Sequence, residues 1–203
     1  MKKLLVAGAI ALFGLSNAQI AKGSTYLSGN LNFSTIDNNN NNTTQNELKL
    51  VPSVGYFVAD NLAVGLGIGY ANTMDKVENK AAYSKVSSNA LVVEPFIRKY
   101  WGLGDKLSIF GQLSVPMAFG NVKAENNVTS SKETFSQYGV VVKPGLNYFV
   151  SNNWAIEATL GEFGWNNSQF KNAQAVNAYK FGLNFDSVGL GVKYFFTKTA
   201  AAK

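Results

Sequence analysis

Large apolar residues alternate with small ones along much of this 203-residue chain, and this period of two constrains its fold more than any other feature. From Leu62 to Tyr70 the even positions carry only leucine, valine, isoleucine or tyrosine, and the odd positions carry only alanine or glycine. Such alternation is typical of β-strands, because successive side chains of a strand point to opposite faces. The chain is therefore predicted to be an all-β protein.

A hairpin unit occurs three times. The segments are VPSVGYFVADNLAVG from Val51, EPFIRKYWGLGDKLSIFG from Glu94 and KPGLNYFVSNNWAIEATLG from Lys143. Each runs from a proline to an aromatic residue, then through a short turn rich in Asp, Asn or Gly into another alternating strand, which predicts a tight hairpin. Longer polar segments separate these units, at 35–46, 72–88, 120–134 and 166–178.

Eight strands are predicted from these breaks, at 24–34, 47–58, 62–72, 89–101, 106–119, 135–150, 154–165 and 179–196. Short and long connections alternate, which is typical of an outer-membrane barrel with periplasmic turns and extracellular loops. A soluble barrel such as a lipocalin has the same periodicity with its faces reversed. We expect pairing defects at Pro52, Pro95 and Pro144, which lack an amide hydrogen, and a β-bulge near 186–187, where the alternation changes phase.

The charged residues of the strands distinguish the two kinds of barrel. They lie on the small-residue face, which otherwise carries mainly Gly, Ala, Ser and Asn, whereas the outside of a soluble protein would carry charges at most positions. This favours a narrow polar lumen. The lumenal residues are Lys49, Glu94, Arg98, Lys143, Glu157 and Lys193.

Unpaired charges in such a lumen are costly, so we predict an ionic network that closes it. Glu157 is expected to pair with Lys193, because their strands are neighbours. Glu94 is expected to reach Lys143 or Arg98 across the barrel. The competing interpretation is a hydrated lumen that serves as a narrow, porin-like channel for small solutes.

Aromatic residues of the large-residue face gather near the strand ends. A first set lies near the short turns and the end of the last strand: Tyr56, Trp101, Tyr148, Trp154, Tyr194 and Phe196. A second set lies near the long connections: Phe33, Tyr70, Phe119, Tyr138 and Phe181. Two aromatic girdles around an aliphatic band suit a lipid-facing surface. The predicted fold is an eight-stranded antiparallel up-and-down transmembrane β-barrel.

The chain is predicted to be exported. Lys2 and Lys3 precede an apolar segment, 4–15, that is too short to span a bilayer, and Ser16-Asn17-Ala18 fits a cleavage site. We therefore expect a cleaved signal peptide at 1–18, the barrel at 19–196 and a short tail at 197–203.

The chain resembles the eight-stranded outer-membrane β-barrel proteins of the OmpA-barrel and OmpX-like type. The resemblance rests on the hairpins that begin at Glu94 and Lys143 and on the terminal VGLGVKYFF from Val188. It implies a bacterial outer-membrane location, with membrane lipid, lipopolysaccharide, the barrel-assembly machinery and an extracellular loop ligand as partners. Gly191, Tyr194 and Phe196 match the family's insertion signal, although family members usually end at that aromatic residue.

Composition weakens other function classes. The chain has no cysteine and no histidine, so it lacks the usual general base of serine hydrolases and the commonest zinc ligands. Its net charge of +6 is spread out, which does not favour nucleic-acid binding. We expect a structural or surface-interaction role without catalysis, cofactor or metal. A lipid-directed enzyme is the least favoured alternative.

Overall fold

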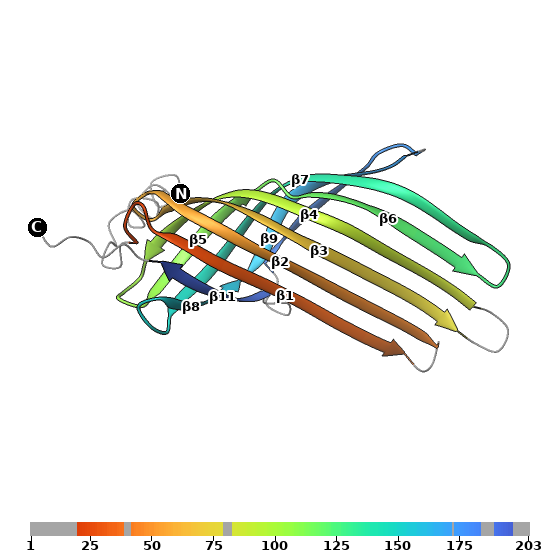
Figure 1. The fold of residues 1–203 in the computed structure, drawn as a ribbon, viewed down its shortest axis with the longest axis horizontal. Coiled ribbons are helices and arrows are strands. Elements are labelled where there is room, and N and C mark those ends of the chain that lie inside the picture. The colour runs from red at the N-terminus through yellow and green to blue at the C-terminus, as the bar shows by residue number, and fades with distance from the viewer. Residues whose placement is uncertain (1–19, 39–41, 79–82, 172, 184–188, 197–203) are drawn as a thin grey trace, which may run out of the picture.

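The computed structural model describes residues 20–38, 42–78, 83–171, 173–183 and 189–196, and the regular structure of these residues is entirely β-strand (Figure 1). No helix in these ranges is long and apolar enough to cross a membrane. The predicted signal peptide, the predicted tail and the phase change at 186–187 lie outside the described residues.

In the described ranges, eleven strand segments make up eight antiparallel strands, since three of the strands are interrupted. The interrupted strands consist of β5 with β6, β8 with β9, and β10 with β11. The segments are β1 (Thr25–Asn38), β2 (Thr43–Ala59), β3 (Leu62–Glu78), β4 (Tyr83–Gly102), β5 (Leu107–Ser114), β6 (Met117–Asn126), β7 (Ser130–Phe149), β8 (Trp154–Thr159), β9 (Gly161–Phe170), β10 (Val176–Leu183) and β11 (Gly189–Phe196). This confirms the predicted all-β, up-and-down fold.

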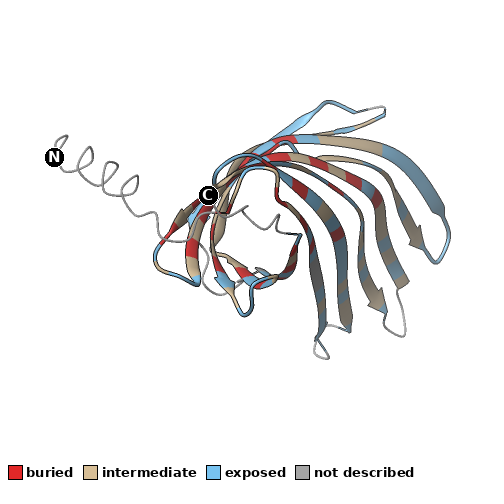
Figure 2. Ribbon diagram, turned by 60° about the vertical axis from the view of Figure 1, so that its left-hand side comes forward, coloured by how far each residue is buried: buried red, intermediate tan, exposed pale blue. Residues whose placement is uncertain are grey.

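The strands form a closed ring at the end where the short turns lie. The ladder runs from β1 through β2, β3, β4, β5, β7, β8 and β11 back to β1. Thr25 at the start of β1 thus lies opposite both Tyr56 and Phe196. At the other end the sheet spreads out (Figure 2). There, within the described residues, β10 pairs only with β9, and β1 beyond Asn30 pairs only with β2.

The strands extend further than the alternation predicted. Residues 72–88, expected to form a long loop, are mostly the paired ends of β3 and β4, which are in register up to Glu78 and Tyr83. The other three polar connections are likewise largely strand. The loop prediction was wrong because alternation reveals only strands with an apolar face, whereas backbone pairing needs no apolar face. We call these polar strand ends the strand extensions.

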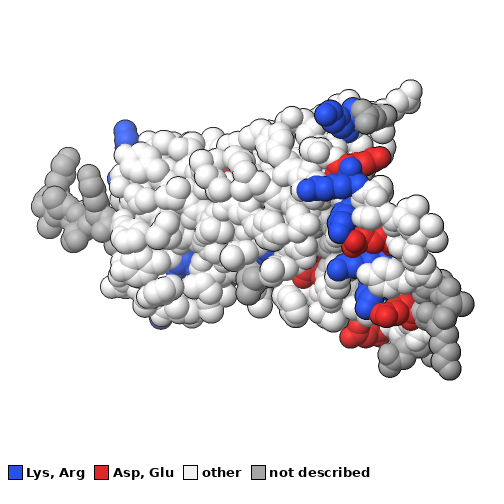
Figure 3. Space-filling model, turned by 45° about the vertical axis from the view of Figure 1, so that its right-hand side comes forward, with Lys and Arg blue, Asp and Glu red and all other residues white. Residues whose placement is uncertain are grey.

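The outer face of the ring is apolar. Leu66, Ile68 and Tyr70 on β3 are exposed, whereas Gly67 between them is buried. In the view of Figure 3 the charged residues gather at the end of the strand extensions, and most of the remaining surface carries no charge. An exposed apolar band of this kind suits lipid contact.

The aromatic residues predicted to lie near the short turns are on this outer face. Tyr56, Tyr148, Trp154 and Phe196 are each about half exposed, and the Tyr194 ring packs between two of them. Its centroid is 5.0 Å from that of Trp154 and 4.8 Å from that of Phe196. Trp101 is half-buried.

All three expected pairing defects are present. At Pro52 the ladder between β2 and β3 is interrupted. The Pro95 carbonyl accepts a hydrogen bond of 3.0 Å from the amide of Val115, in the gap between β5 and β6. The Pro144 carbonyl accepts one of 3.0 Å from the amide of Leu160, where β8 and β9 separate. Pro95 and Pro144 therefore lie beside the breaks between β5 and β6 and between β8 and β9, whereas Pro52 lies at a gap in the ladder between two unbroken strands.

The inner face does not carry small residues throughout. The prediction that the large residues face lipid was therefore wrong at the short-turn end of the barrel. Five aromatic side chains fill the ring there, each no more than 2% exposed. We call them the aromatic floor: Tyr26, Phe57, Tyr100, Phe110 and Phe195. The interior of an eight-stranded barrel is just wide enough for side chains to fill. Rings can occupy it here because glycines leave space beside them.

Glycine positions on the inner face are matched to aromatic side chains. Gly55 lies directly opposite Tyr26, and Gly145 lies directly opposite Phe110. A Cβ on either glycine would come within 2.3 Å of the opposing ring. The glycine-rich face of the sequence is therefore what allows the rings to pack inward.

This packing predicts that Gly55→Ala destabilises the barrel by about 1–3 kcal/mol, because the buried Tyr26 ring has to move. Gly29→Ala is the matched control, since a Cβ there would meet nothing within 4 Å. Urea unfolding in phospholipid vesicles measures both. Equal stability of the two variants would contradict the proposed packing of glycine against tyrosine.

Candidate functional site

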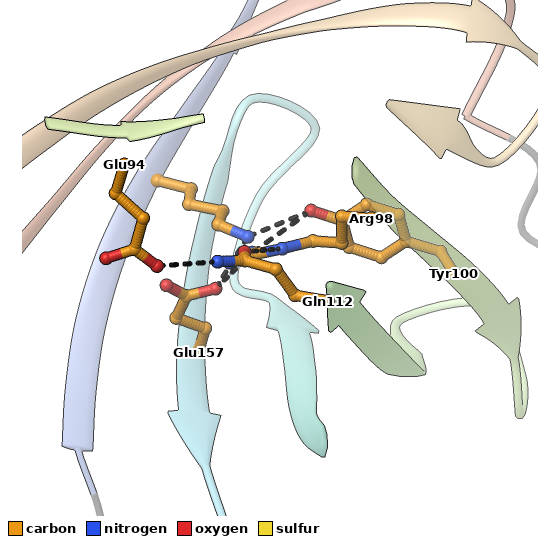
Figure 4. A network of polar contacts seen from close by, with 6 residues as sticks. Glu94, Arg98, Tyr100, Gln112 and Glu157 are labelled. Carbon is orange, nitrogen blue, oxygen red and sulfur yellow. Dashed lines mark hydrogen bonds and ion pairs between the residues drawn. The ribbon is translucent and has the colours of Figure 1, made fainter. Parts of the chain in front are cut away.

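Three charged side chains meet inside the ring (Figure 4). They lie directly above the aromatic floor. Arg98 on β4 and Lys193 on β11 each place a nitrogen 2.6 Å from Oε2 of Glu157 on β8. Their exposures are 6%, 0% and 1%, respectively. One buried carboxylate is therefore the shared counterion of two buried cations from two different strands.

Two neutral side chains complete this level. Arg98 Nε donates a hydrogen bond of 2.7 Å to Gln112 Oε1, and Lys193 Nζ donates one of 2.9 Å to the Tyr100 hydroxyl. Neither Gln112 nor Tyr100 was among the predicted site residues. The sequence did contain a signal for them, because inward residues alternate along a strand. Tyr100 lies two residues from the inward Arg98, and Gln112 lies two residues from the inward Ser114.

A second level lies above the first. Lys143 on β7 donates a hydrogen bond of 2.7 Å to Glu94 on β4. Gln112 Nε2 is 3.3 Å from the same carboxylate oxygen, so its amide links the two levels. The inward charges from four strands therefore form one connected set.

Lys49, which was predicted to join this network, is not brought into it. It is exposed and has no ion pair within 4 Å among the residues that the structure describes. With Glu94 and Lys143, it lines a cavity of about 290 Å³ above the second level. Glu94 is already bonded to Lys143, and Lys49 lies nearer the spreading end of the sheet.

The aromatic floor supports the cations from below. The Arg98 guanidinium carbon lies 4.2 Å from the Phe110 ring centroid, and Lys193 Nζ lies 4.8 Å from that of Tyr26. Such contacts stabilise a desolvated cation. Consecutive rings of the floor lie 5.4–6.0 Å apart from Phe110 to Phe195. Ile20 is also buried in this cluster.

The arrangement offers packing and charge compensation. In the described residues, no group of three or more His, Cys, Asp or Glu side chains is placed to hold a metal ion. The carboxylates of Glu94 and Glu157 face cations.

The residues matched to an insertion signal lie on β11. Tyr194 and Phe196 lie on the outer face, with their ring centroids 4.8 Å apart. Gly191 is buried and lies opposite Glu157. The two aromatic residues are thus at the lipid-facing surface of the last strand, beside Trp154.

A ring of eight antiparallel strands with an apolar outside and a charged, filled inside defines an outer-membrane β-barrel. The chain belongs to the family of the outer membrane protein beta-barrel domain, which matches residues 5–196. No curated protein matches the chain significantly.

Several solved structures are similar to the chain. The N-terminal β-barrel domain of Pseudomonas aeruginosa OprF is 14% identical, with coverage of 86% of this chain and 98% of that one and a TM-score of 0.40. Neisserial surface protein A is 12% identical, with coverage of 85% and 99% and a TM-score of 0.44. Ail of Yersinia pestis is 16% identical, with coverage of 86% and 99% and a TM-score of 0.42.

Proposed function

We propose that this outer-membrane barrel is closed to solutes and has a structural and surface-interaction role, without catalytic activity. The observation that carries the proposal is the stack of two ionic levels on the aromatic floor. Arg98, Glu157 and Lys193 are buried and mutually bonded, and the floor below them is packed ring to ring. A lumen filled in this way leaves the outer surface and the strand extensions as the parts that meet other molecules.

The partners follow from the surfaces. The apolar band meets membrane lipid, and the strand extensions meet lipopolysaccharide and an extracellular ligand. The barrel-assembly machinery recognises the last strand, β11, by Gly191, Tyr194 and Phe196. The outward-facing aromatic pair on β11, half-buried Tyr194 and exposed Phe196, supports this assignment.

The alternative function is a narrow channel for small solutes. The cavity of about 290 Å³ favours it, because its lining includes Lys49, Thr73, Ser88 and Gln137. The two ionic levels and the floor lie in series below this cavity. We therefore propose that the cavity is a recess of the lumen that ends at the ionic levels and does not continue through the barrel.

The role at the cell surface requires the strand extensions to lie outside. Single cysteines at Glu78 and Asn127 should react with an impermeant maleimide on intact cells, because these residues lie at two hairpin ends of the extensions. Cysteines at Asp60 and Asn152, in short turns at the closed end, should react only after lysis. The reverse labelling pattern would overturn both the orientation and the surface role.

A further inference from the structure

Four lysines lie on the outer face of the strand extensions, within the residues that the structure describes. We call them the lysine belt: Lys76 on β3, Lys85 on β4, Lys123 on β6 and Lys132 on β7. The ladders joining these strands keep a constant register in this region, so each belt lysine shares the face of the lipid-facing residues lower on its own strand. They belong to the charged end visible in Figure 3.

The belt places like charges directly opposite one another. Lys76 is paired in register with Lys85, and Lys123 is paired in register with Lys132. Directly opposite side chains have Cβ atoms about 4.5–5.5 Å apart, and like charges at such positions are destabilising. Two such pairs on one face therefore weaken the isolated sheet.

Among the described residues, only half of the belt lysines form an ion pair. Lys76 is bonded to Glu78 on its own strand, and Lys123 lies 2.6 Å from Glu125. Lys85 and Lys132 form no ion pair within 4 Å in the described part of the chain. Glu125 lies opposite Lys85 in the ladder between β4 and β6, but its carboxylate is bonded to Lys123. Two carboxylates thus accompany four lysines, and an anion held between the two lysines of a pair would supply the missing negative charge.

The height of the belt indicates what kind of anion can reach it. Lys76 follows Tyr70 by six residues and Lys132 precedes Tyr138 by six. That is about 20 Å along a strand, or about 15 Å along the membrane normal for a strand tilted by about 40°. A phospholipid headgroup layer is only about 5–7 Å deep. The partner has to project well beyond an ordinary headgroup.

The surface between the girdle and the belt is also polar. Asn72, Asn89 and Asn121 form one row across β3, β4 and β6. Asn72 donates a hydrogen bond of 2.8 Å to Asn89, which also accepts one from the Tyr70 hydroxyl. Amides at this height suit the hydroxyl groups of a saccharide.

We propose that the lysine belt binds phosphate groups on the saccharide of lipopolysaccharide in the outer leaflet. This inference rests on the proposed function, which puts the strand extensions outside the cell. A phosphate between Lys76 and Lys85, or between Lys123 and Lys132, removes the repulsion within the pair, and its sugars contact the asparagine row.

The test compares Lys85→Gln/Lys132→Gln with a control, Lys22→Gln/Lys106→Gln, which removes two exposed lysines near the short turns. Each protein is refolded into phosphatidylcholine vesicles containing increasing fractions of lipopolysaccharide, and its thermal midpoint is measured. Each lysine near an anionic surface contributes about fivefold, so the fraction giving half of the stabilisation should rise about 30-fold in the belt variant. Without lipopolysaccharide the belt variant should be at least as stable as the wild type, because the opposed charges are gone.

Equal stabilisation of both variants would overturn the proposal. So would undiminished stabilisation by dephosphorylated lipopolysaccharide, which would assign the effect to sugars alone. A wild-type response to soluble heparin but not to lipopolysaccharide would assign the belt to a dissolved polyanion. Maleimide labelling and conductance do not depend on these lysines, so a failure of the belt is distinguishable from a failure of the proposed function.

Discussion

Glu157→Gln is expected to destabilise the barrel by about 3–5 kcal/mol, because it leaves Arg98 and Lys193 buried without their shared counterion. Glutamine keeps the volume of the side chain, so the loss arises from charge and not from a cavity. The measurement is equilibrium urea unfolding in phosphatidylcholine vesicles.

The control for this prediction is Glu162→Gln. Glu162 lies 3.9 Å from Lys180, and both side chains are substantially exposed, at 36% and 67%. Exposed pairs contribute about 0–1 kcal/mol. A Glu157→Gln variant as stable as this control would show that the central carboxylate does not hold the network together.

The second large effect concerns the two layers that block the lumen, the lower ionic level and the aromatic floor. Arg98→Ala/Glu157→Ala removes most of the lower ionic level but leaves the aromatic floor, so we expect only brief openings in planar bilayers. Adding Tyr100→Ala removes the ring that lies 5.7 Å from Phe57 and 6.0 Å from Phe110, measured between ring centroids. Steady ion conductance is expected only in this triple variant.

Comparison of these two variants shows whether the lower ionic level or the aromatic floor blocks ions. If the double variant conducts as steadily as the triple variant, the aromatic floor does not block ions. If the folded triple variant is silent, the four remaining rings or the second level of Glu94 and Lys143 still close the lumen, and Tyr100 is not essential to the block. Circular dichroism of each refolded variant checks that the barrel is intact.

The strand order and the two faces could be predicted from the sequence because the bilayer imposes a strict pattern. On β3, every outward position from Leu62 to Tyr70 is large and apolar, and every inward position is glycine or alanine. The pair of Glu157 with Lys193 was predicted from strand adjacency, and Lys143 was one of the two partners predicted for Glu94. The other, Arg98, bonds Glu157 instead, which was not predicted. The breaks at the prolines were anticipated from a missing amide hydrogen.

Two features could not be predicted from the same pattern. The strand extensions carry no apolar face, so alternation alone does not distinguish them from loops. The aromatic floor was missed because a large residue in an alternating strand was assumed to face lipid. Phe57 and Phe195 each follow or precede an outward aromatic residue, Tyr56 or Phe196, so the sequence shows two adjacent large residues without showing which one faces inward. Glycines opposite Tyr26 and Phe110 mark where inward rings fit.

The most direct test of a closed lumen is the conductance of the wild-type barrel in a planar bilayer. The purified protein should be nearly silent in potassium chloride at voltages where general porins conduct steadily, because buried ionic levels and packed rings lie in series across its lumen. Steady wild-type conductance comparable with that of a general porin would contradict the account. It would mean that the charges of Arg98, Glu157 and Lys193 line a hydrated path through the membrane.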